Sequence, residues 1–253
     1  MVEQRFGCTA CGKCCYGRVP LTVDDALAHA GRFPLAMVWT PVRQASRSFD
    51  LTGRLGITLK LRDRKTAAVL IAPTAYIPPT FPCPALSPDN LCTIHEHKPL
   101  RCRTMPFYPY REERDQLDLL IPRKGWVCDV SETAPVVYRD KEVLDRADFD
   151  AERAALLAQA PALRTYAEAL LNQDATLLDH LTRAARNPAA GHVILNFSSF
   201  LRANRHYDLV SFAKSQHPVL IEFERRTAGE ASLAERNKYY KCWAGELEWF
   251  ANR

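Results

Sequence analysis

The sequence predicts an α+β protein, in which a loop-rich cysteine-cluster domain with a small antiparallel sheet precedes an α-helical C-terminal region. The first 130 of 253 residues hold eight of the nine cysteines, 13 of the 17 prolines and seven of the ten glycines. Proline and glycine interrupt regular structure. Beyond residue 130, apolar residues recur at three- and four-residue steps, which is typical of helices. We therefore expect a metal-binding cysteine-cluster domain at residues 1–130 and a helical region at residues 131–253.

Short periodic stretches predict the regular elements of the first part. Thr22 or Asp24 is suited to cap a helix from Asp24 to about Arg32. Apolar and polar residues alternate from Leu55 to Leu61, as in a half-buried strand. The polar turn 62–65 separates this stretch from an apolar run at 67–71, so the two predict a hairpin. A further strand is expected from Leu117 to Ile121.

Beyond residue 130 the elements are expected to be helices. Leucines between Leu163 and Leu181 predict two helices with a break at Asp174, and the apolar residues from Val193 to Leu201 predict another. The residues Ser232–Glu235 match a capping box at the start of the last helix. Its aromatic stripe is interpreted as a core-facing side. The prolines of this part are expected to separate the helical segments, and they are Pro135, Pro161, Pro188 and Pro218.

Composition limits the cellular setting. The chain is 47% hydrophobic and 25% charged, with a mild net charge of +5. Residues 1–6 lack the apolar core of a signal peptide, and no run approaches the ~20 apolar residues of a membrane span. Arginines are scattered, which does not favour a nucleic-acid partner. We therefore expect a soluble cytoplasmic protein without a membrane partner, and in that compartment many cysteines indicate metal rather than disulfides.

A cluster of cysteines near the start of the chain carries the chemistry. Cys8, Cys11, Cys14 and Cys15 form a C-x2-C-x2-C-C run, whose neighbours Thr9, Ala10, Gly12 and Lys13 build no core. Buried structural cysteines usually occur singly among apolar residues, so this density indicates ligation. Eight thiols suffice for two four-coordinate sites, and the candidate metal ligands are Cys8, Cys11, Cys14, Cys15, Cys83, Cys92, Cys102 and Cys128.

Iron–sulfur and zinc are the two metal alternatives, and disulfides are a third reading with less support. The C-x2-C-x2-C spacing is that of ferredoxin-type [4Fe-4S] sites, whose distal ligand precedes a proline, and Cys83-Pro84 fits that role. Zinc is the rival because C-x2-C is also its usual half-site. The adjacent Cys14 and Cys15 suit either two neighbouring centres or one ligand and one bystander. We weigh iron–sulfur ahead of zinc.

Basic residues surround the distal cysteines. Arg101 and Arg103 flank Cys102, and Lys98, His97 and Lys13 are close to cysteines in sequence. They are candidate donors to sulfur, or they form a solvated basic turn. His95 and His97 are more simply surface residues, because the thiols already suffice. Cys242 stands alone in an Ala-, Leu- and aromatic-rich helix, and we expect it to be dispensable for metal binding.

The motifs resemble a known family. The runs C-x2-C-G-x-C-C, V-x-L-T-x-x-D, C-P-x-L, L-C-x-I-H and K-P-x-x-C-R-x-x-P-F, spread over residues 6–130, are similar to the YkgJ-type cysteine-cluster proteins, a family of zinc- or iron-chelating domains. The resemblance implies a ligand set of Cys8, Cys11, Cys14, Cys15, Cys83, Cys92 and Cys102, with Cys128 matching a later, less constant cysteine. Flagellin lysine N-methylase contains a similar cysteine domain, but nothing in residues 131–253 indicates a methylase.

Two classes of function follow. In the first, the protein holds iron–sulfur clusters that support redox or group-transfer chemistry, with protein methylation as one form. In the second, a structural zinc stabilises a module that recognises a protein partner. The sequence contains no Ser/His/Asp set, phosphate-binding glycine loop or recognisable S-adenosylmethionine site. It therefore assigns no catalytic residue.

Overall fold

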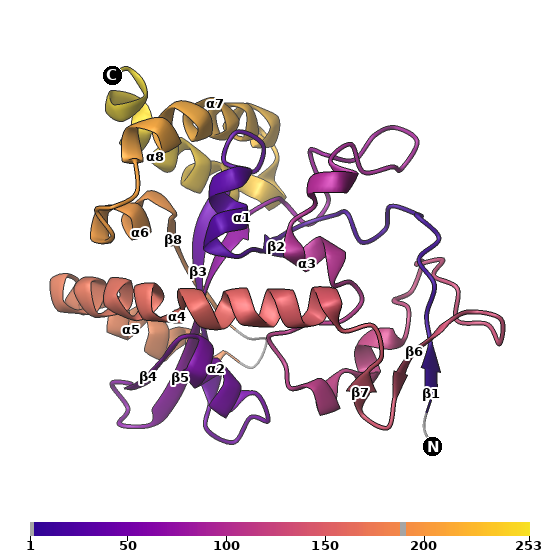
Figure 1. Cartoon of the computed structure of the whole chain (residues 1–253). Helices are drawn as coiled ribbons and strands as arrows, with labels where there is room; N and C mark the ends of the chain where they lie inside the picture. The colour runs from indigo at the N-terminus through magenta and orange to yellow at the C-terminus, as the bar shows by residue number, and fades with distance from the viewer. Residues whose placement is uncertain (1–2, 188–190) are drawn as a thin grey trace.

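The structure, a computed structural model, describes residues 3–187 and 191–253 (Figure 1). The strands are β1 (Glu3–Arg5), β2 (Val19–Pro20), β3 (Leu35–Arg43), β4 (Ile57–Lys60), β5 (Thr66–Ala75), β6 (Val136–Arg139), β7 (Glu142–Val143) and β8 (Val193–Asn196). The α-helices are α1 (Val23–Ala28), α2 (Phe49–Leu55), α3 (Leu100–Arg103), α4 (Ala147–Gln173), α5 (Ala175–Arg186), α6 (Ser198–Ala203), α7 (Leu209–Thr227) and α8 (Ala234–Ala251). Short 3-10 helices lie at His95–His97, Glu113–Asp115, Leu117–Leu120 and Ala231–Leu233. The α+β prediction is confirmed.

A five-stranded antiparallel sheet forms the centre of the molecule. Its strand order is β2-β5-β3-β8, and β4 pairs with β5. The long strands β3 and β5 pair over their whole length, with Leu35 opposite Ala75 and Arg43 opposite Ala67. Strand β8 reaches only from Ala36 to Trp39 along β3, so within the described strands Pro41 faces β5 alone. A proline is tolerated there because its missing N–H does not interrupt a second ladder.

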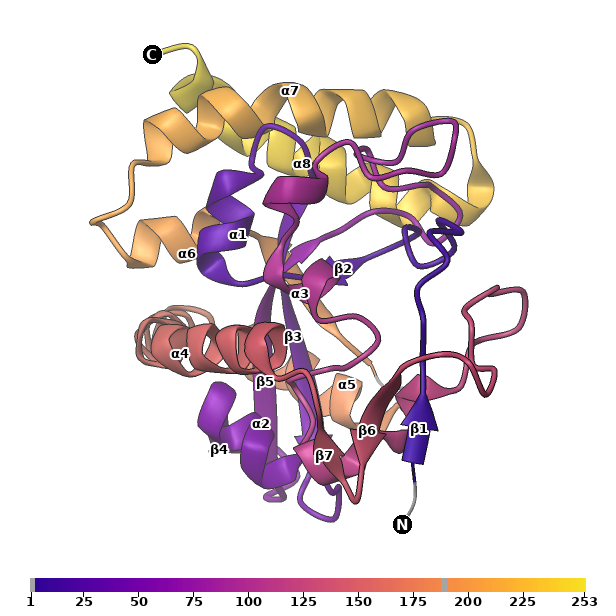
Figure 2. The same cartoon turned by 45° about the vertical axis from the view of Figure 1, so that its right-hand side comes forward.

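Helices from the C-terminal half pack on this sheet. Helix α4 lies across it, and α7 and α8 run side by side at one end (Figures 1 and 2). The main core joins Trp39 of β3 to Tyr166 of α4 and Tyr240 of α8, all with 0% exposure. A separate small core holds the three-stranded sheet β1-β6-β7 against Phe107 and Phe149. The boundary at residue 130 stays a prediction, and the main core draws on residues from both sides of it.

Locally determined elements match the predictions in position, although α1 ends at Ala28 and not near Arg32. Thr22 caps α1, since its hydroxyl accepts from the Asp25 N–H at 3.1 Å. Strands β4 and β5 form the expected hairpin. Helices α4 and α5 break at Asp174, whose carboxylate accepts from the Thr176 N–H at 2.8 Å.

The strand expected at Leu117–Ile121 is wrong, because Leu117–Leu120 form a 3-10 helix. The preceding Gln116 is completely buried, and its side-chain amide donates to three backbone carbonyls, among them that of Tyr108. These hydrogen bonds hold residues 108–116 in a compact turn, and the 3-10 helix follows directly. A short apolar run does not by itself distinguish a strand from a helical turn.

The helix expected from Val193 to Leu201 is also wrong in its first half. Residues 193–196 form β8, because the edge of β3 offers free hydrogen-bonding groups, and α6 begins only at Ser198. The capping box at Ser232 is absent as well. The Ser232 hydroxyl donates to Glu230, and α8 begins at Ala234 without a side-chain cap.

Two of the prolines expected to separate helices lie inside them. Pro161 is within α4 and Pro218 within α7, whereas Pro188 lies outside the described residues. A proline inside a helix costs about 3 kcal/mol. Burial of neighbours such as Leu163 and Leu220, both with 0% exposure, offsets this cost in the folded protein.

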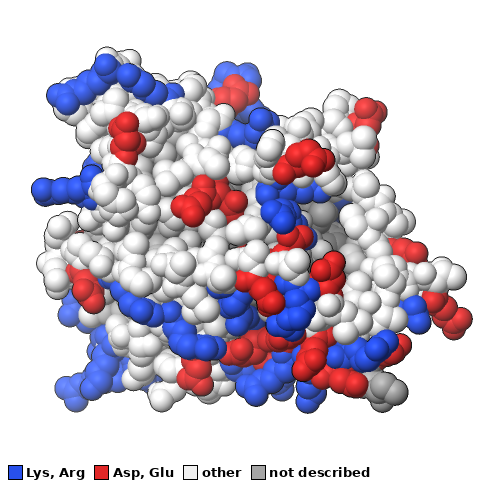
Figure 3. Space-filling model, viewed as in Figure 1, with Lys and Arg blue, Asp and Glu red and all other residues white. Residues whose placement is uncertain are grey.

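Acidic and basic side chains are interspersed on the face shown in Figure 3. Ion pairs join separate segments of the chain, such as Arg54 with Glu112 and Arg146 with Glu113. In the described part of the chain, no helix is both long and apolar enough to cross a membrane.

His192 links the start of β8 to the sheet and gives a pH-dependent prediction. The Arg18 guanidinium donates to His192 Nε2 at 2.8 Å, and Nδ1 is 2.8 Å from the Thr40 hydroxyl. Burial, and then the Arg18 charge, lower the pKa of His192 to about 4, so the folded state holds it neutral. An unfolded chain binds this proton nearer pH 6.5, so acid favours unfolding as the pH falls from 6.5 towards 4. Because the ring is partly exposed, we expect a loss of about 1–2 kcal/mol.

The matched variant is His192→Gln, whose amide keeps a donor and an acceptor but does not titrate. Between pH 7 and 4.5, its free energy of unfolding should fall less steeply than that of the natural protein, measured by urea denaturation. Parallel pH profiles for the two proteins would contradict this account.

Candidate metal centre

Seven of the nine cysteines lie in irregular segments, and the other two lie on helices. Cys8–Cys15 belong to the loop between β1 and β2, Cys83 and Cys92 to the loop after β5, Cys102 to α3, and Cys128 to the loop before β6. All nine are free thiols. Cys242 lies on α8, where its thiol is 3.6 Å from Glu246 Oε1.

Backbone pairing brings Cys8 and Cys128 together. Gly7 and Asp129 form an antiparallel bridge, in which each N–H donates to the other's carbonyl at 2.7 and 2.9 Å. Two residues on, the Thr9 hydroxyl donates to the Val127 carbonyl at 2.8 Å. Cys8 and Cys128 lie between these contacts, as the next opposed pair of the register.

A second pairing brings Cys15 and Cys83 together. Tyr16 and Pro82 form an antiparallel bridge, and the Cys83 N–H donates to the Cys15 carbonyl at 2.7 Å. On the other side of the bridge, the Gly17 N–H donates to the Phe81 carbonyl at 3.2 Å. The loop between β1 and β2 is thus held at two places, by residues 127–129 and by residues 81–83.

Cys92 and Cys102 lie beside this second pairing. Leu86 and Cys92 form an antiparallel bridge, so the loop folds back and returns Cys92 towards Cys83. The fold-back is held by the Thr93 N–H, which donates to the carbonyl of the buried Ala85 at 2.8 Å. The charge of Cys83 also raises the pKa of Cys102.

Burial and neighbouring thiols raise the pKa values of Cys102 and Cys83. Although Cys102 keeps accessible surface, surrounding protein atoms desolvate its thiol and raise its pKa to about 12, with further increases from Cys83, Cys14 and Cys92. Burial is also the main cause that raises the pKa of Cys83, and repulsion by Cys92 and Cys14 adds to it. Ionised thiols in this group repel one another, and a bound cation removes that cost.

The pKa values of Cys14 and Cys11 are instead lowered. The Sγ atoms of Cys14 and Cys15 are 4.0 Å apart, and the Cys15 thiol, donating to Cys14, holds the pKa of Cys14 down to about 6 against partial burial. The same contact is the main cause that raises the pKa of Cys15. The backbone N–H groups of Val127 and Lys13 lower the pKa of Cys11. Cys14 and Cys11 are therefore the thiols best prepared to become the thiolates that metals bind.

The donor set fits a metal or an iron–sulfur cluster. Within residues 3–187 and 191–253, no three His, Cys, Asp or Glu side chains are placed around one common point for an ion. The backbone pairings nevertheless bring segments that carry thiols together. Thiolates suit zinc and iron–sulfur clusters equally.

Comparison with protein families also indicates metal chelation. Residues 7–120 match the CxxCxxCC family model, described as "Putative zinc- or iron-chelating domain". This segment of the chain is similar to that family. The match supports metal binding, and it includes Cys8 to Cys102 but ends before Cys128. Comparison with curated proteins and with solved structures finds no match.

The motifs of the chelating domain also position α3, which carries Cys102. The Asp25 carboxylate, from the V-x-L-T-x-x-D motif, accepts from the Leu100 N–H at 3.1 Å and from the Thr22 hydroxyl at 2.8 Å. Leu100 opens the helix within the K-P-x-x-C motif. Two motifs 75 positions apart are therefore joined by one carboxylate. This role of Asp25 was not recognised from sequence, although the spacing of the motif marks the residue.

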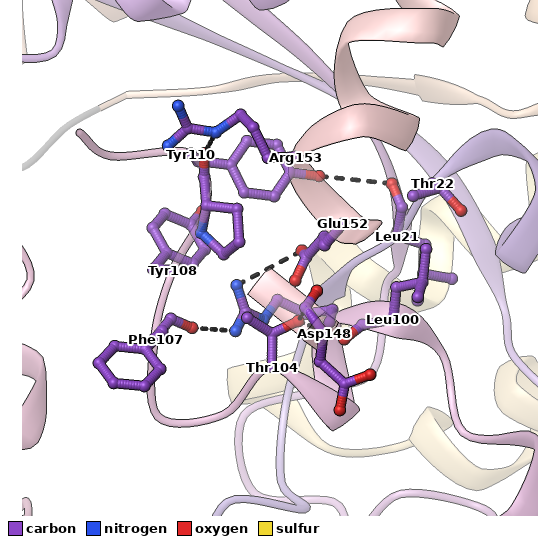
Figure 4. Close-up of polar contacts among 12 residues, drawn as sticks. Leu21, Thr22, Leu100, Thr104, Phe107, Tyr108, Tyr110, Asp148, Glu152 and Arg153 are labelled. Atoms are coloured by element: carbon purple, nitrogen blue, oxygen red, sulfur yellow. Dashed lines mark hydrogen bonds and ion pairs between the residues drawn. The ribbon is translucent and has the colours of Figure 1, made fainter. Parts of the chain in front are cut away.

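A buried ion pair holds α3 against α4 (Figure 4). Arg101 Nη1 is 3.4 Å from Glu152 Oε1, with side-chain exposures of 5% and 1%, and Nη2 donates to the Phe107 carbonyl. Arg103 likewise pairs with Asp148. Both arginines flanking Cys102 thus bind α4, although the Arg101 charge still lowers the pKa of Cys102 against the effect of burial. Glu152 and Asp148 were missed because nothing in the sequence pairs them with Arg101 and Arg103 across some fifty positions.

The histidines remain at the surface. His95 and His97 are exposed on the short 3-10 helix before α3. Lys98 acts differently, since its charge helps to lower the pKa of Cys14. Of the basic residues considered, Lys98 and Arg101 thus act on the thiols electrostatically.

The buried pair gives a stability prediction. Burial raises the pKa of Glu152 in spite of Arg101, and among the described residues Arg101 Nε and Glu152 Oε2 have no hydrogen-bond partner. Glu152→Gln leaves the Arg101 charge buried without its counter-ion, so we expect a loss of about 3–5 kcal/mol in the free energy of unfolding.

The control is the double variant Arg101→Met with Glu152→Leu, which removes both charges and fills the space with apolar groups. Urea denaturation should show it to be more stable than Glu152→Gln. If the double variant is instead less stable than Glu152→Gln, the attraction within the ion pair exceeds the cost of burying its two charges, and the interpretation is wrong.

Proposed function

We propose that the chelating domain holds iron–sulfur clusters of the [4Fe-4S] type through Cys8, Cys11, Cys14, Cys15, Cys83, Cys92, Cys102 and Cys128. The observation that carries the proposal is that two backbone pairings bring Cys128 and Cys83 to the cysteine loop, while a third bridge returns Cys92 towards Cys83. At these pairings Cys8 lies opposite Cys128, and Cys15 lies opposite Cys83. An all-thiolate donor set with a C-x2-C-x2-C run is that of iron–sulfur proteins.

The chain's own residues prepare the site. The N–H groups of Val127 and Lys13 and the thiol of Cys15 favour the thiolate at Cys11 and Cys14. Arg101 and Lys98 bring positive charge to sulfurs that carry excess negative charge once a cluster is bound. When bound, such a cluster supplies one-electron redox chemistry or a site for group transfer.

A structural zinc site is the second candidate. Its support is the exposed apolar surface next to the ligands, where Leu91 is 56% exposed beside Cys92 and Val127 is 64% exposed beside Cys128. Such residues suit contact with a protein partner or protein substrate. In this reading, zinc closes the loops and the apolar rim recognises the partner. A cytoplasmic location, where thiols stay reduced, is part of both readings.

Metal analysis after anaerobic purification separates the two candidates. We expect a brown protein with iron and acid-labile sulfide in equal amounts, whose visible absorption bleaches in air. Zinc without sulfide would favour the structural reading. Protein that contains neither metal nor sulfide and has paired thiols would refute both.

Two substitutions make this test specific. Cys11→Ser should lower the metal content, because Cys11 lies against Val127 within the pairing that brings Cys8 to Cys128. Cys242→Ser is the matched control and should leave the metal content unchanged, because that exposed thiol lies on α8 against Glu246. Equal losses in the two variants would place α8 at the metal site.

A further inference from the structure

The cysteine loop is divided into two parts by a turn. The Cys15 N–H donates to the Gly12 carbonyl at 3.0 Å, which closes a β-turn over residues 12–15. Gly12 has φ +70°, and a Cβ there would lie 3.0 Å from the Asn90 side chain, so the turn requires glycine. Before the turn the loop pairs with residues 127–129, and after it the loop pairs with residues 81–83.

We infer that the eight thiols form two separate centres, one held by Cys8, Cys11, Cys14 and Cys128 and the other by Cys15, Cys83, Cys92 and Cys102. This inference rests on the proposed metal binding and adds to it how the ligands are divided. Cys128 replaces Cys83 as the distal ligand of the C-x2-C-x2-C run, because the register places Cys128 opposite Cys8 and Cys83 opposite Cys15.

The adjacent pair Cys14-Cys15 is then the junction between the centres. Cys14 is inside the turn and completes the C-x2-C-x2-C run, whereas Cys15 ends the turn and enters the second pairing. Two neighbouring sulfurs, 4.0 Å apart, are thereby directed to different centres. Each centre receives four thiolates, which is the ligand number of both a [4Fe-4S] cluster and a structural zinc ion.

Paired substitutions test the division by counting metal. Single variants Cys128→Ser and Cys92→Ser should each retain about half of the wild-type metal, because the other centre keeps its four ligands. The pair Cys8→Ser with Cys128→Ser removes two ligands of one centre and should retain the same half. The pair Cys92→Ser with Cys128→Ser damages both centres and should retain almost none. Cys242→Ser serves as the control with full metal content.

The outcomes separate this inference from the proposal beneath it. Wild-type protein without metal refutes metal binding itself. Metal-loaded wild type whose single variants each lose all metal, or whose two pairs lose equal amounts, refutes the division into two centres.

A measurement on the natural protein covers the case in which a variant fails to fold. The loaded protein is treated with increasing chelator, the freed thiols are alkylated, and each cysteine is followed by mass spectrometry. Cys8, Cys11, Cys14 and Cys128 should lose protection as one set, and Cys15, Cys83, Cys92 and Cys102 as another. Loss of protection by all eight in a single step, or in differently composed sets, would overturn the inference.

Discussion

The chelating domain depends on two short backbone pairings of one loop. The cysteine loop has almost no core of its own, since Cys8, Thr9, Ala10, Lys13 and Cys14 are all exposed. The bridge from Gly7 to Asp129 and the bridge from Tyr16 to Pro82 hold it at its two ends. Each joins segments far apart in sequence, with Thr9 and Val127 separated by 118 positions. Closing such loops costs entropy that a few hydrogen bonds offset only in part, and we propose that shared metal ligation supplies the remainder.

The scaffold behind the loop consists of regular elements that share an apolar core, whereas the loop itself is irregular. The main sheet and helices α4, α7 and α8 share one apolar core, and α3 is fixed on α4 by the buried Arg101–Glu152 pair. Cys102 is therefore presented from a fixed element, whereas Cys8–Cys15 come from an irregular one. This arrangement suits a site that assembles as metal binds, with Cys102 already fixed on α3.

Local features could be predicted from the sequence, and long-range ones could not. The cap at Thr22, the β4–β5 hairpin and the break at Asp174 depend on neighbouring residues. Strand β3 was missed because it is buried on both faces and contains Pro41, so it shows no alternation. Strand β8 was taken for a helix because its partner lies some 150 positions away. The cysteine density marked the candidate ligands, but the pairing of Cys8 with Cys128 and of Cys15 with Cys83 depends on registers that no local pattern encodes.

Amide hydrogen exchange, compared between metal-loaded and metal-free protein, tests most directly whether metal holds these segments together. The probes are the Gly7, Asp129 and Cys83 amides, which form the two pairings, and the β3–β5 amides serve as the internal reference. We expect metal removal to abolish protection at the three probes and to leave the β3–β5 ladder protected. Equal loss of protection in both sets, or unchanged protection at Gly7, Asp129 and Cys83, would contradict the account.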